Sequence, residues 1–246
     1  DVQISSDGAL IAIHDATLTR TTNVETLFAP RDGGYSVSDF TLAEIKTLTA
    51  LTVATAGYGY SGFTPSSPDP FRVPTLSEVI GLANGWNADR GADVGVYPEA
   101  KAASTELNRK IVEELAAGGF GDPGDKAIIQ SFSFAALRDI LVLQGALGTD
   151  IFQAALGAAV LDDEGVYGVF DFGVGASVPL TEITGFARGV GVTLRSPNLD
   201  ADFIGAAHDL GLQVYGWTFI TAEPVAASAQ FQTSIDIGTD GFFANF

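Results

Sequence analysis

The sequence predicts an α/β fold of the TIM type, a (β/α)8 barrel of parallel strands, and three observations support this prediction. Strand-like apolar segments alternate with helical segments of about ten residues through most of the chain, a pattern typical of parallel strands joined by right-handed crossovers. The length of 246 residues is usual for a single barrel. An open doubly wound sheet would carry a glycine-rich phosphate loop after its first strand, and no such loop follows the first predicted strand.

The first fifteen residues predict a β-hairpin. Two β-rich runs flank Asp7-Gly8, a dipeptide typical of two-residue turns. If these two residues form the centre of the turn, the numbers of cross-strand partners sum to fifteen. Asp1 then lies opposite His14, within the roughly 5 Å that separates direct cross-strand neighbours. The hairpin would therefore bring a carboxylate and an imidazole together.

Residues 23–72 are irregular and rich in Gly, Pro, Ser and Tyr. They predict a loop-rich inserted subdomain within a single domain that spans residues 1–246. One helix is expected to begin at Thr41, where Leu-Ala-Glu follows in a capping-box pattern. A second helix is expected to begin at Pro74-Thr75 and to end near Gly85.

The rest of the chain predicts regular alternation, with a loop rich in Gly and acidic residues between residues 155 and 180. About seven of the eight barrel strands are visible, and the chain begins within a strand, so we expect the first barrel strand to lie upstream of Asp1. The later predicted strands cover residues 93–99, 127–131, 151–155, 190–194, 213–219 and 241–244. The predicted helices cover residues 106–117, 134–143, 180–188 and 200–210, and a short helix precedes the last strand.

The composition excludes several classes of function. Asp and Glu outnumber Lys and Arg by 30 to 12, giving a formal net charge of −18, which repels the phosphate backbone and makes nucleic acid an unlikely partner. The chain contains no Cys, so disulfides, thiolate metal sites and thiol nucleophiles are excluded. No apolar run approaches the roughly 18 residues that a bilayer-spanning helix needs, so stable membrane insertion is not expected.

Polar residues at the C-terminal ends of barrel strands are the candidates for chemistry, because TIM-barrel sites are built there. Glu99 and Lys101 lie two residues apart, so both would point into the barrel mouth. His14 exchanges protons near neutral pH, as a general acid or base must. Asp1 and Glu99 offer the oxygen ligands that Ca²⁺ or Mg²⁺ prefers. Further residues at predicted strand ends are Ser131, Phe132, Trp217, Thr218 and Asp240, whereas His208 is expected to be structural, on the outer helical ring.

The motifs of this chain, taken in order, resemble those of the glycerophosphodiester phosphodiesterase family, and particularly its periplasmic branch that scavenges glycerol phosphate. The resemblance covers nearly the whole chain. Each motif is weak by itself, and the ordered set is specific. The segments are Asp1-Val-Gln-Ile-Ser-Ser-Asp-Gly, His14-Asp15 with Leu18-Thr-Arg20-Thr-Thr, Phe40-Thr-Leu-Ala-Glu-Ile-Lys46, Val73-Pro-Thr-Leu-Ser-Glu78, Tyr97-Pro-Glu99-Ala-Lys101, Gln130-Ser-Phe132, Gly216-Trp217-Thr218 and Asp240-Gly241-Phe-Phe.

The resemblance implies metal-dependent hydrolysis of glycerophosphodiesters to sn-glycerol 3-phosphate and an alcohol such as choline, ethanolamine or glycerol. It assigns Asp1 and Glu99 to a divalent cation, Ca²⁺ first and Mg²⁺ as the alternative, and His14 to general acid–base catalysis. The resemblance places Lys101 near the substrate phosphate, and Arg20, Phe132 and Trp217 are further candidates for substrate binding. A periplasmic or secreted location is implied as well.

Three departures from the family pattern bear on the site. The family's upstream His-Arg motif and the Glu two residues before Asp1 do not occur in this sequence, so one histidine and one metal ligand are expected in an upstream segment. The last strand ends with Ala244-Asn-Phe instead of the family's Thr-Asp-x-Pro.

Two other functions are compatible with the sequence. A phospholipase-D-like member of the same superfamily would act on lipid headgroups through an exposed apolar rim, for which Tyr58, Tyr60 and Phe63 are candidates. A non-catalytic module that binds phosphodiesters is the second alternative, and it requires that the full-length protein lack a second catalytic histidine.

Overall fold

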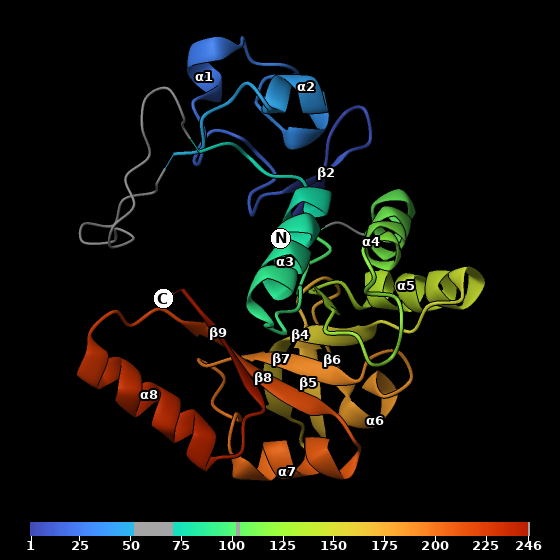
Figure 1. Cartoon of the computed structure of the whole chain (residues 1–246). Coiled ribbons are helices and arrows are strands. Elements are labelled where there is room, and N and C mark those ends of the chain that lie inside the picture. The colour runs from blue at the N-terminus through green and yellow to red at the C-terminus, as the bar shows by residue number, and fades with distance from the viewer. Residues whose placement is uncertain (52–70, 102–103, 246) are drawn as a thin grey trace. The chain divides into compact units, whose positions relative to one another are not determined.

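The computed structural model describes residues 1–51, 71–101 and 104–245 (Figure 1). The chain divides into two compact units, an N-terminal unit of Asp1–Val96 and a C-terminal unit of Tyr97–Phe246. Residues 52–70 of the predicted insertion, including Tyr58, Tyr60 and Phe63, lie outside the described residues. None of the described helices combines the length and the apolar character that a bilayer crossing requires.

The N-terminal unit begins with the predicted hairpin, in which strand β1 (Val2–Ile4) pairs antiparallel with β2 (Leu10–Ala12). The register differs from the prediction by one residue, since Gln3 pairs with Ile11 and the numbers of partners sum to fourteen. Asp1 is therefore level with Ile13, and the predicted placement opposite His14 is wrong.

The length of the turn explains this error. Ser5 donates its backbone N–H to Ala9 O at 2.9 Å, which closes a loop of three residues instead of two. Gly8 occupies the left-handed region with φ of 81°, as the last residue of a three-residue hairpin loop does. The Ser5 hydroxyl donates to Asp7 Oδ1 at 2.7 Å and accepts from Ala9 N–H at 2.8 Å, so side-chain bonds favour the longer loop.

Two predicted helix starts in this unit are confirmed. Thr41 caps α2 (Leu42–Ile45) and Thr75 caps α3 (Leu76–Arg90), each in a complete capping box. Helix α3 does not end near Gly85 but continues to Gly91, which takes φ of 60° and closes the helix. The short helices α1 (Val24–Leu27) and η1 (Val37–Asp39) complete the unit. Its core is formed by Ile11, Ile13, Leu18, Val24, Val37, Phe40, Ile45, Leu48 and Val73.

The C-terminal unit is built on a parallel sheet, as predicted. Its parallel strands are β3 (Ile128–Ser131), β4 (Phe152–Leu161), β7 (Gly189–Thr193), β8 (Gln213–Phe219) and β9 (Gly241–Ala244), and they pair in this order. The predicted strand at residues 93–99 is reduced to a parallel bridge between Glu99 and Gln130. Gln130 N–H donates to Pro98 O at 3.0 Å, and Ala100 N–H donates to Gln130 O at 2.9 Å. This bridge fixes Glu99 beside β3.

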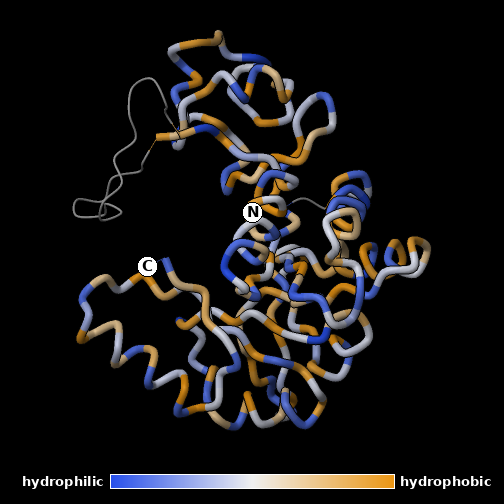
Figure 2. The backbone as a smooth tube through the Cα atoms, viewed as in Figure 1, coloured by the Kyte–Doolittle hydropathy of each residue, from blue (hydrophilic) through white to orange (hydrophobic). Residues whose placement is uncertain are grey.

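Helices connect these strands as the sequence predicts, although several lengths differ. The helices are α4 (Thr105–Ala117), α5 (Phe134–Leu147), α6 (Leu180–Ile183), α7 (Ala201–Asp209) and α8 (Pro224–Asp236). Helix α6 has only four residues where nine were predicted, whereas α8 is longer than expected. Figure 2 shows hydrophobic and hydrophilic residues interspersed along α8, and only Ser234 of this helix is buried.

A β-hairpin extension stands where the sequence predicted a loop. The second half of β4, residues 158–161, pairs antiparallel with β5 (Tyr167–Asp171), which in turn pairs with β6 (Ala176–Pro179). The Gly- and acid-rich residues that suggested a loop form the turn between β4 and β5. Strand β4 therefore extends past the C-terminal ends of its parallel neighbours and continues into this hairpin.

The two faces of the parallel sheet differ in character. Val190, Val192 and Val214 belong to an aliphatic cluster that includes Phe203 and Ile204 of α7. Residues that alternate with them lie on the opposite face, where Tyr215 contacts Tyr97, Phe152 and Phe243 at ring-centroid distances of 5.8, 6.4 and 6.3 Å. A Cβ at Gly189 would lie 3.0 Å from the Tyr215 ring, so glycine makes room for these aromatic side chains.

Candidate functional site

The predicted catalytic residue His14 lies two residues after the end of β2 in the N-terminal unit. Its Nδ1 is 2.7 Å from Asp15 Oδ1, and its side chain is 62% exposed. Arg20 binds the same carboxylate through two nitrogens: Nη2 donates to Oδ1 at 2.7 Å, and Nε donates to Oδ2. The sequence grouped these three residues, and the structure brings their side chains together with Asp15 in the middle.

The charge state of Asp15 follows from these contacts. The Arg20 hydrogen bonds, and then the His14 contact, hold the pKa of Asp15 well below its usual range. An ionised Asp15 accepts a hydrogen bond from His14 Nδ1–H, which leaves Nε2 as the imidazole nitrogen available for proton exchange. Arg20 contacts His14 only indirectly, through the Asp15 carboxylate that both bind, and its predicted role in substrate binding stays a prediction.

Glu99 and Lys101 form an ion pair in the C-terminal unit. Lys101 Nζ lies 3.0 Å from Glu99 Oε1, and Glu99 is only 5% exposed. The bridge to Gln130 fixes the backbone between these residues. The prediction that both side chains are on the same side of their segment is consistent with this contact.

The predicted aromatic residues lie together at the C-terminal ends of the strands. Phe132 follows β3, and its ring packs edge-on against Trp217 of β8, with centroids 5.3 Å apart and an interplanar angle of 89°. Trp217 is level with Thr193, the last residue of β7. Its Nε1 is buried and has no hydrogen-bond partner within the described part of the chain. Both rings are half-buried.

A further aromatic residue at this edge was missed. Phe172, in the loop between β5 and β6, has its ring centroid 6.0 Å from that of Phe132. The segment was interpreted as a loop because glycines interrupt it. The β-rich run Val166-Tyr-Gly-Val-Phe170, which follows the turn residues Asp-Asp-Glu-Gly165, was the signal that would have revealed the hairpin.

Asp240 was predicted at a strand's C-terminal end, and this placement is wrong. It precedes β9 and lies at the opposite edge of the sheet, because β9 begins at Gly241. Asp240 Oδ2 accepts a hydrogen bond from Val214 N–H at 2.7 Å and lies 2.8 Å from His208 Nε2. His208 is on α7, as predicted, and its contact with Asp240 links this helix to the sheet.

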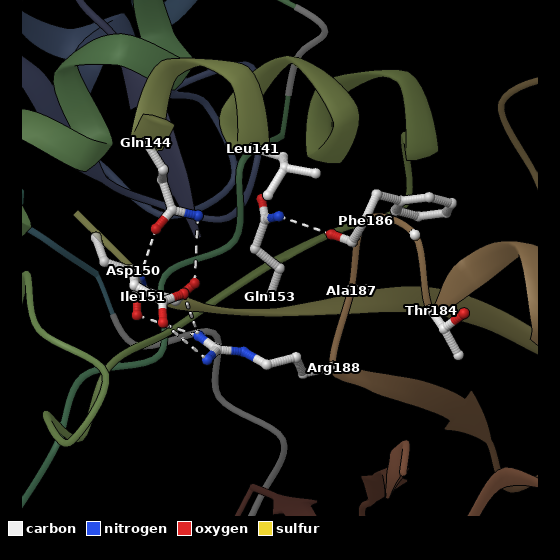
Figure 3. Close-up of a pocket in the computed structure, with 10 residues that line it drawn as sticks. Leu141, Gln144, Asp150, Ile151, Gln153, Thr184, Phe186, Ala187 and Arg188 are labelled. Carbon is white, nitrogen blue, oxygen red and sulfur yellow. Dashed lines mark hydrogen bonds and ion pairs between the residues drawn. The ribbon is translucent and has the colours of Figure 1, made fainter. Parts of the chain in front are cut away.

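A pocket also lies at this N-terminal edge (Figure 3). The cavity measures about 130 Å³ and contains none of the predicted site residues. Figure 3 shows its polar groups bonded to one another: Gln153 Nε2 donates to Phe186 O at 2.7 Å, and Arg188 Nη2 lies 3.2 Å from Asp150 Oδ1. Because TIM-type sites lie at the other edge, we assign this pocket to packing.

The residues that could hold a metal ion are the two predicted carboxylates. Asp1 belongs to the N-terminal unit and Glu99 to the C-terminal unit, so their convergence stays a prediction. Within residues 1–51, 71–101 and 104–245, no three His, Asp or Glu side chains are grouped as a metal site. The donor chemistry fits, since carboxylate oxygens are the ligands that Ca²⁺ and Mg²⁺ prefer.

Comparisons with known proteins agree with the motifs and with the fold. A glycerophosphodiester phosphodiesterase of Bacillus subtilis is 30% identical over 258 residues, covering 100% of this chain and 72% of that protein. One of Haemophilus influenzae is 30% identical over 154 residues, covering 57% of this chain, and the match spans 42% of that protein's length. The crystal structure of a glycerophosphodiester phosphodiesterase from Agrobacterium tumefaciens has a TM-score of 0.62 and 20% identity, covering 100% of this chain and 81% of that chain.

The structural likeness confirms the predicted α/β fold of the TIM type. The comparisons do not separate the branches of the family, so the periplasmic branch stays a prediction. The model of the glycerophosphoryl diester phosphodiesterase family matches residues 1–246. The chain therefore belongs to this family of phosphoric diester hydrolases.

Proposed function

We propose that this protein hydrolyses glycerophosphodiesters to sn-glycerol 3-phosphate and an alcohol, with His14 as a general acid or base. Membership of the family supports the reaction class. The observation that carries the proposal is the arrangement of His14, Asp15 and Arg20, because an exposed imidazole with one nitrogen held by a carboxylate is suited to proton transfer.

Asp15 performs two tasks in this proposal. It fixes the tautomer in which Nδ1 carries the proton, so Nε2 is presented to the substrate. It also stabilises the imidazolium that forms when Nε2 takes a proton, because its own charge persists at low pH. Arg20 keeps the carboxylate in place through its two hydrogen bonds.

A divalent cation, Ca²⁺ or Mg²⁺, is part of the proposal, with Asp1 and Glu99 as its protein ligands. When bound, such an ion neutralises phosphate oxygens and lowers the pKa of a coordinated hydroxyl. Lys101 neutralises part of the Glu99 charge and is placed to contact a phosphate oxygen close to that carboxylate. Glu99→Gln should weaken Ca²⁺ binding measured by isothermal titration calorimetry; unchanged affinity would remove Glu99 from the ligand set.

The activity is tested by measuring the release of sn-glycerol 3-phosphate from glycerophosphocholine, with added Ca²⁺ or Mg²⁺ and with EDTA. We expect release with the metal and its loss with EDTA. His14→Ala should lower kcat by a factor of about 10² or more, the usual contribution of a general acid or base. His208→Ala is the matched control, since the second histidine lies at the opposite edge of the sheet from the predicted site.

Three outcomes would contradict the proposal. No release by the full-length protein with either metal would exclude the phosphodiesterase and favour a binding module. Equal activity of His14→Ala and wild type would exclude the catalytic role of the imidazole. Turnover confined to diacylated lipids, with none of glycerophosphocholine, would instead support the phospholipase-D-like function.

A further inference from the structure

The loop between β5 and β6 holds Phe172 in a fixed position. Asp171, only 4% exposed, accepts hydrogen bonds at Oδ1 from Gly173 N–H at 2.7 Å and Val174 N–H at 3.3 Å. Gly175 N–H donates to Asp171 O at 2.8 Å and closes the loop. The buried carboxylate thus orders the backbone that follows Phe172, which is itself 52% exposed.

Phe172 belongs to a series of aromatic rings along the C-terminal edge of the sheet. Its ring centroid lies 5.4 Å from that of Phe170 and 6.0 Å from that of Phe132. The Phe132 ring in turn packs edge-on against Trp217. Three chain segments, the hairpin loop, the end of β3 and the end of β8, therefore contribute Phe172, Phe132 and Trp217. We call these three residues the aromatic wall.

The aromatic wall lies beside the segment that carries Glu99. Phe132 is two residues after Gln130, which bridges to Glu99. Between them Ser131 Oγ donates to Ala100 O at 2.8 Å, which ties the two segments together at this level. A glycerophosphodiester whose phosphate lies near Glu99 and Lys101 would direct one of its two alcohol groups towards the wall.

The chemistry of the wall selects among those alcohols. Aromatic faces attract quaternary ammonium groups through their quadrupole, whereas a neutral polyol gains no such attraction. The polar side-chain atom of these three rings, Trp217 Nε1, is buried. Glu99 pairs with Lys101 and offsets the positive charge of that side chain beside the wall. The formal net charge of −18 also attracts cationic groups over longer distances.

We propose that Phe172, with Phe132 and Trp217, contacts the alcohol headgroup of the substrate and favours esters of quaternary ammonium alcohols over esters of neutral polyols. This inference rests on the proposed phosphodiesterase function and names the substrate class of that site. Phe172 is the determinant of this preference because it is the most exposed of the three rings and belongs to the hairpin extension.

The test compares kcat/KM for glycerophosphocholine and glycerophosphoglycerol, which differ in the charge of the alcohol. Phe172→Ala should lower kcat/KM for the choline ester about two- to five-fold, the range of an exposed cation–π contact, and leave the glycerol ester unchanged. Phe172→Tyr should keep the preference, whereas Phe172→Leu should lose it despite its apolar side chain. Val174→Ala, in the same loop and 71% exposed, is the control.

An equal loss on both esters would overturn the proposal and indicate a structural role or simple apolar contact. No change in Phe172→Ala would overturn it as well. If wild type turns over neither ester, the proposed function fails. The role of the aromatic wall is then tested separately, by measuring the affinity of the protein for each intact ester by calorimetry. Tighter binding of the choline ester by wild type, lost in Phe172→Ala, supports it; equal binding of both esters refutes it.

Discussion

Gly157 marks the point at which β4 leaves the parallel sheet and enters the hairpin extension. Its neighbour Ala158 pairs with Phe170 of β5, while Gly157 itself pairs with Val192 of β7. A Cβ at this position would lie 2.3 Å from Phe170 O and 2.4 Å from Val169 Cγ1. Because one contact is backbone and Val169 is fully buried, neither neighbour can rotate away.

Gly157→Ala should therefore destabilise the protein. Carbon atoms pack at about 3.5 Å or more, so β5 must move by roughly 1 Å to admit the methyl group. Overpacking of this kind costs typically about 1 to 3 kcal/mol, and a backbone contact places this site in the upper half of that range. For a protein of this size each kcal/mol lowers Tm by about 2 to 4 °C, so we expect Tm to fall by about 4 to 12 °C in scanning calorimetry.

Gly205→Ala is the matched control. Gly205 lies within α7, and a Cβ there would meet nothing within 4 Å. Alanine is favoured over glycine in a helix by about 0.5 to 1 kcal/mol, so this variant should melt above wild type. The reasoning fails if Gly157→Ala melts at or above wild type, or if both variants shift Tm in the same direction.

Two further predictions concern the N-terminal unit. Thr75→Val removes the hydroxyl that accepts a hydrogen bond from Glu78 N–H at 3.1 Å. It should lower the free energy of unfolding, measured by urea denaturation, by about 1 kcal/mol. Thr75→Ser should retain the cap, and an equal loss of stability in both variants would contradict the role of the hydroxyl. Hydrogen bonds from Arg31, and then from Thr41, lower the pKa of Glu44 from 4.5 to about 2. The ionised carboxylate therefore stabilises the folded state above pH 4.5, and this effect is lost as pH falls towards 2. Glu44→Gln should therefore have a lower Tm than wild type at pH 7, and the difference in Tm should shrink as pH falls from 4.5 to 2. A difference in Tm that does not change with pH would refute the contribution of the ionised carboxylate.

Local signals in the sequence were sufficient for many of the elements. The helix starts at Thr41 and Thr75 were predicted because a capping box involves only four consecutive residues. Strands β8 and β9 have the predicted bounds, since each is an apolar run flanked by turn residues. The end of α3 was misplaced because Gly85 costs a helix only about 1 kcal/mol, whereas Gly91 ends it by adopting the left-handed conformation.

Errors arose where the outcome depended on contacts that the sequence does not display. Asp7-Gly8 is compatible with a loop of two residues or of three, and the Ser5 hydroxyl bonds favour three. The strand β5 was missed because its pairing partner is the far end of β4, beyond the length expected for a barrel strand. Both errors affected the site: the first placed Asp1 opposite His14, and the second concealed Phe172.

The positions of two candidate residues were predicted correctly, because strand direction alone decides them. Phe132 and Trp217 were expected at C-terminal strand ends and lie there, in contact with each other. Asp240 was misplaced although the bounds of β9 were predicted, because a residue that directly precedes a parallel strand lies at the N-terminal edge of the sheet. The contact of Arg20 with Asp15 was not predicted, since four residues of irregular chain separate them and no periodicity governs their approach.

The two edges of the parallel sheet differ in the contacts that their side chains make. At the N-terminal edge, Asp240 accepts from Val214 and contacts His208, and Gln153 and Arg188 bind neighbouring backbone or carboxylate groups. These contacts hold helices to strands, so changes there should affect stability. Gln153 Oε1 is the exception among these atoms, because it is buried without a hydrogen-bond partner in the described part of the chain. At the C-terminal edge, Trp217 keeps a buried N–H without a partner among the described residues and Phe172 keeps an exposed ring. The exposed ring lies at the edge where TIM-type sites are built, so a change at Phe172 should affect substrate preference rather than stability.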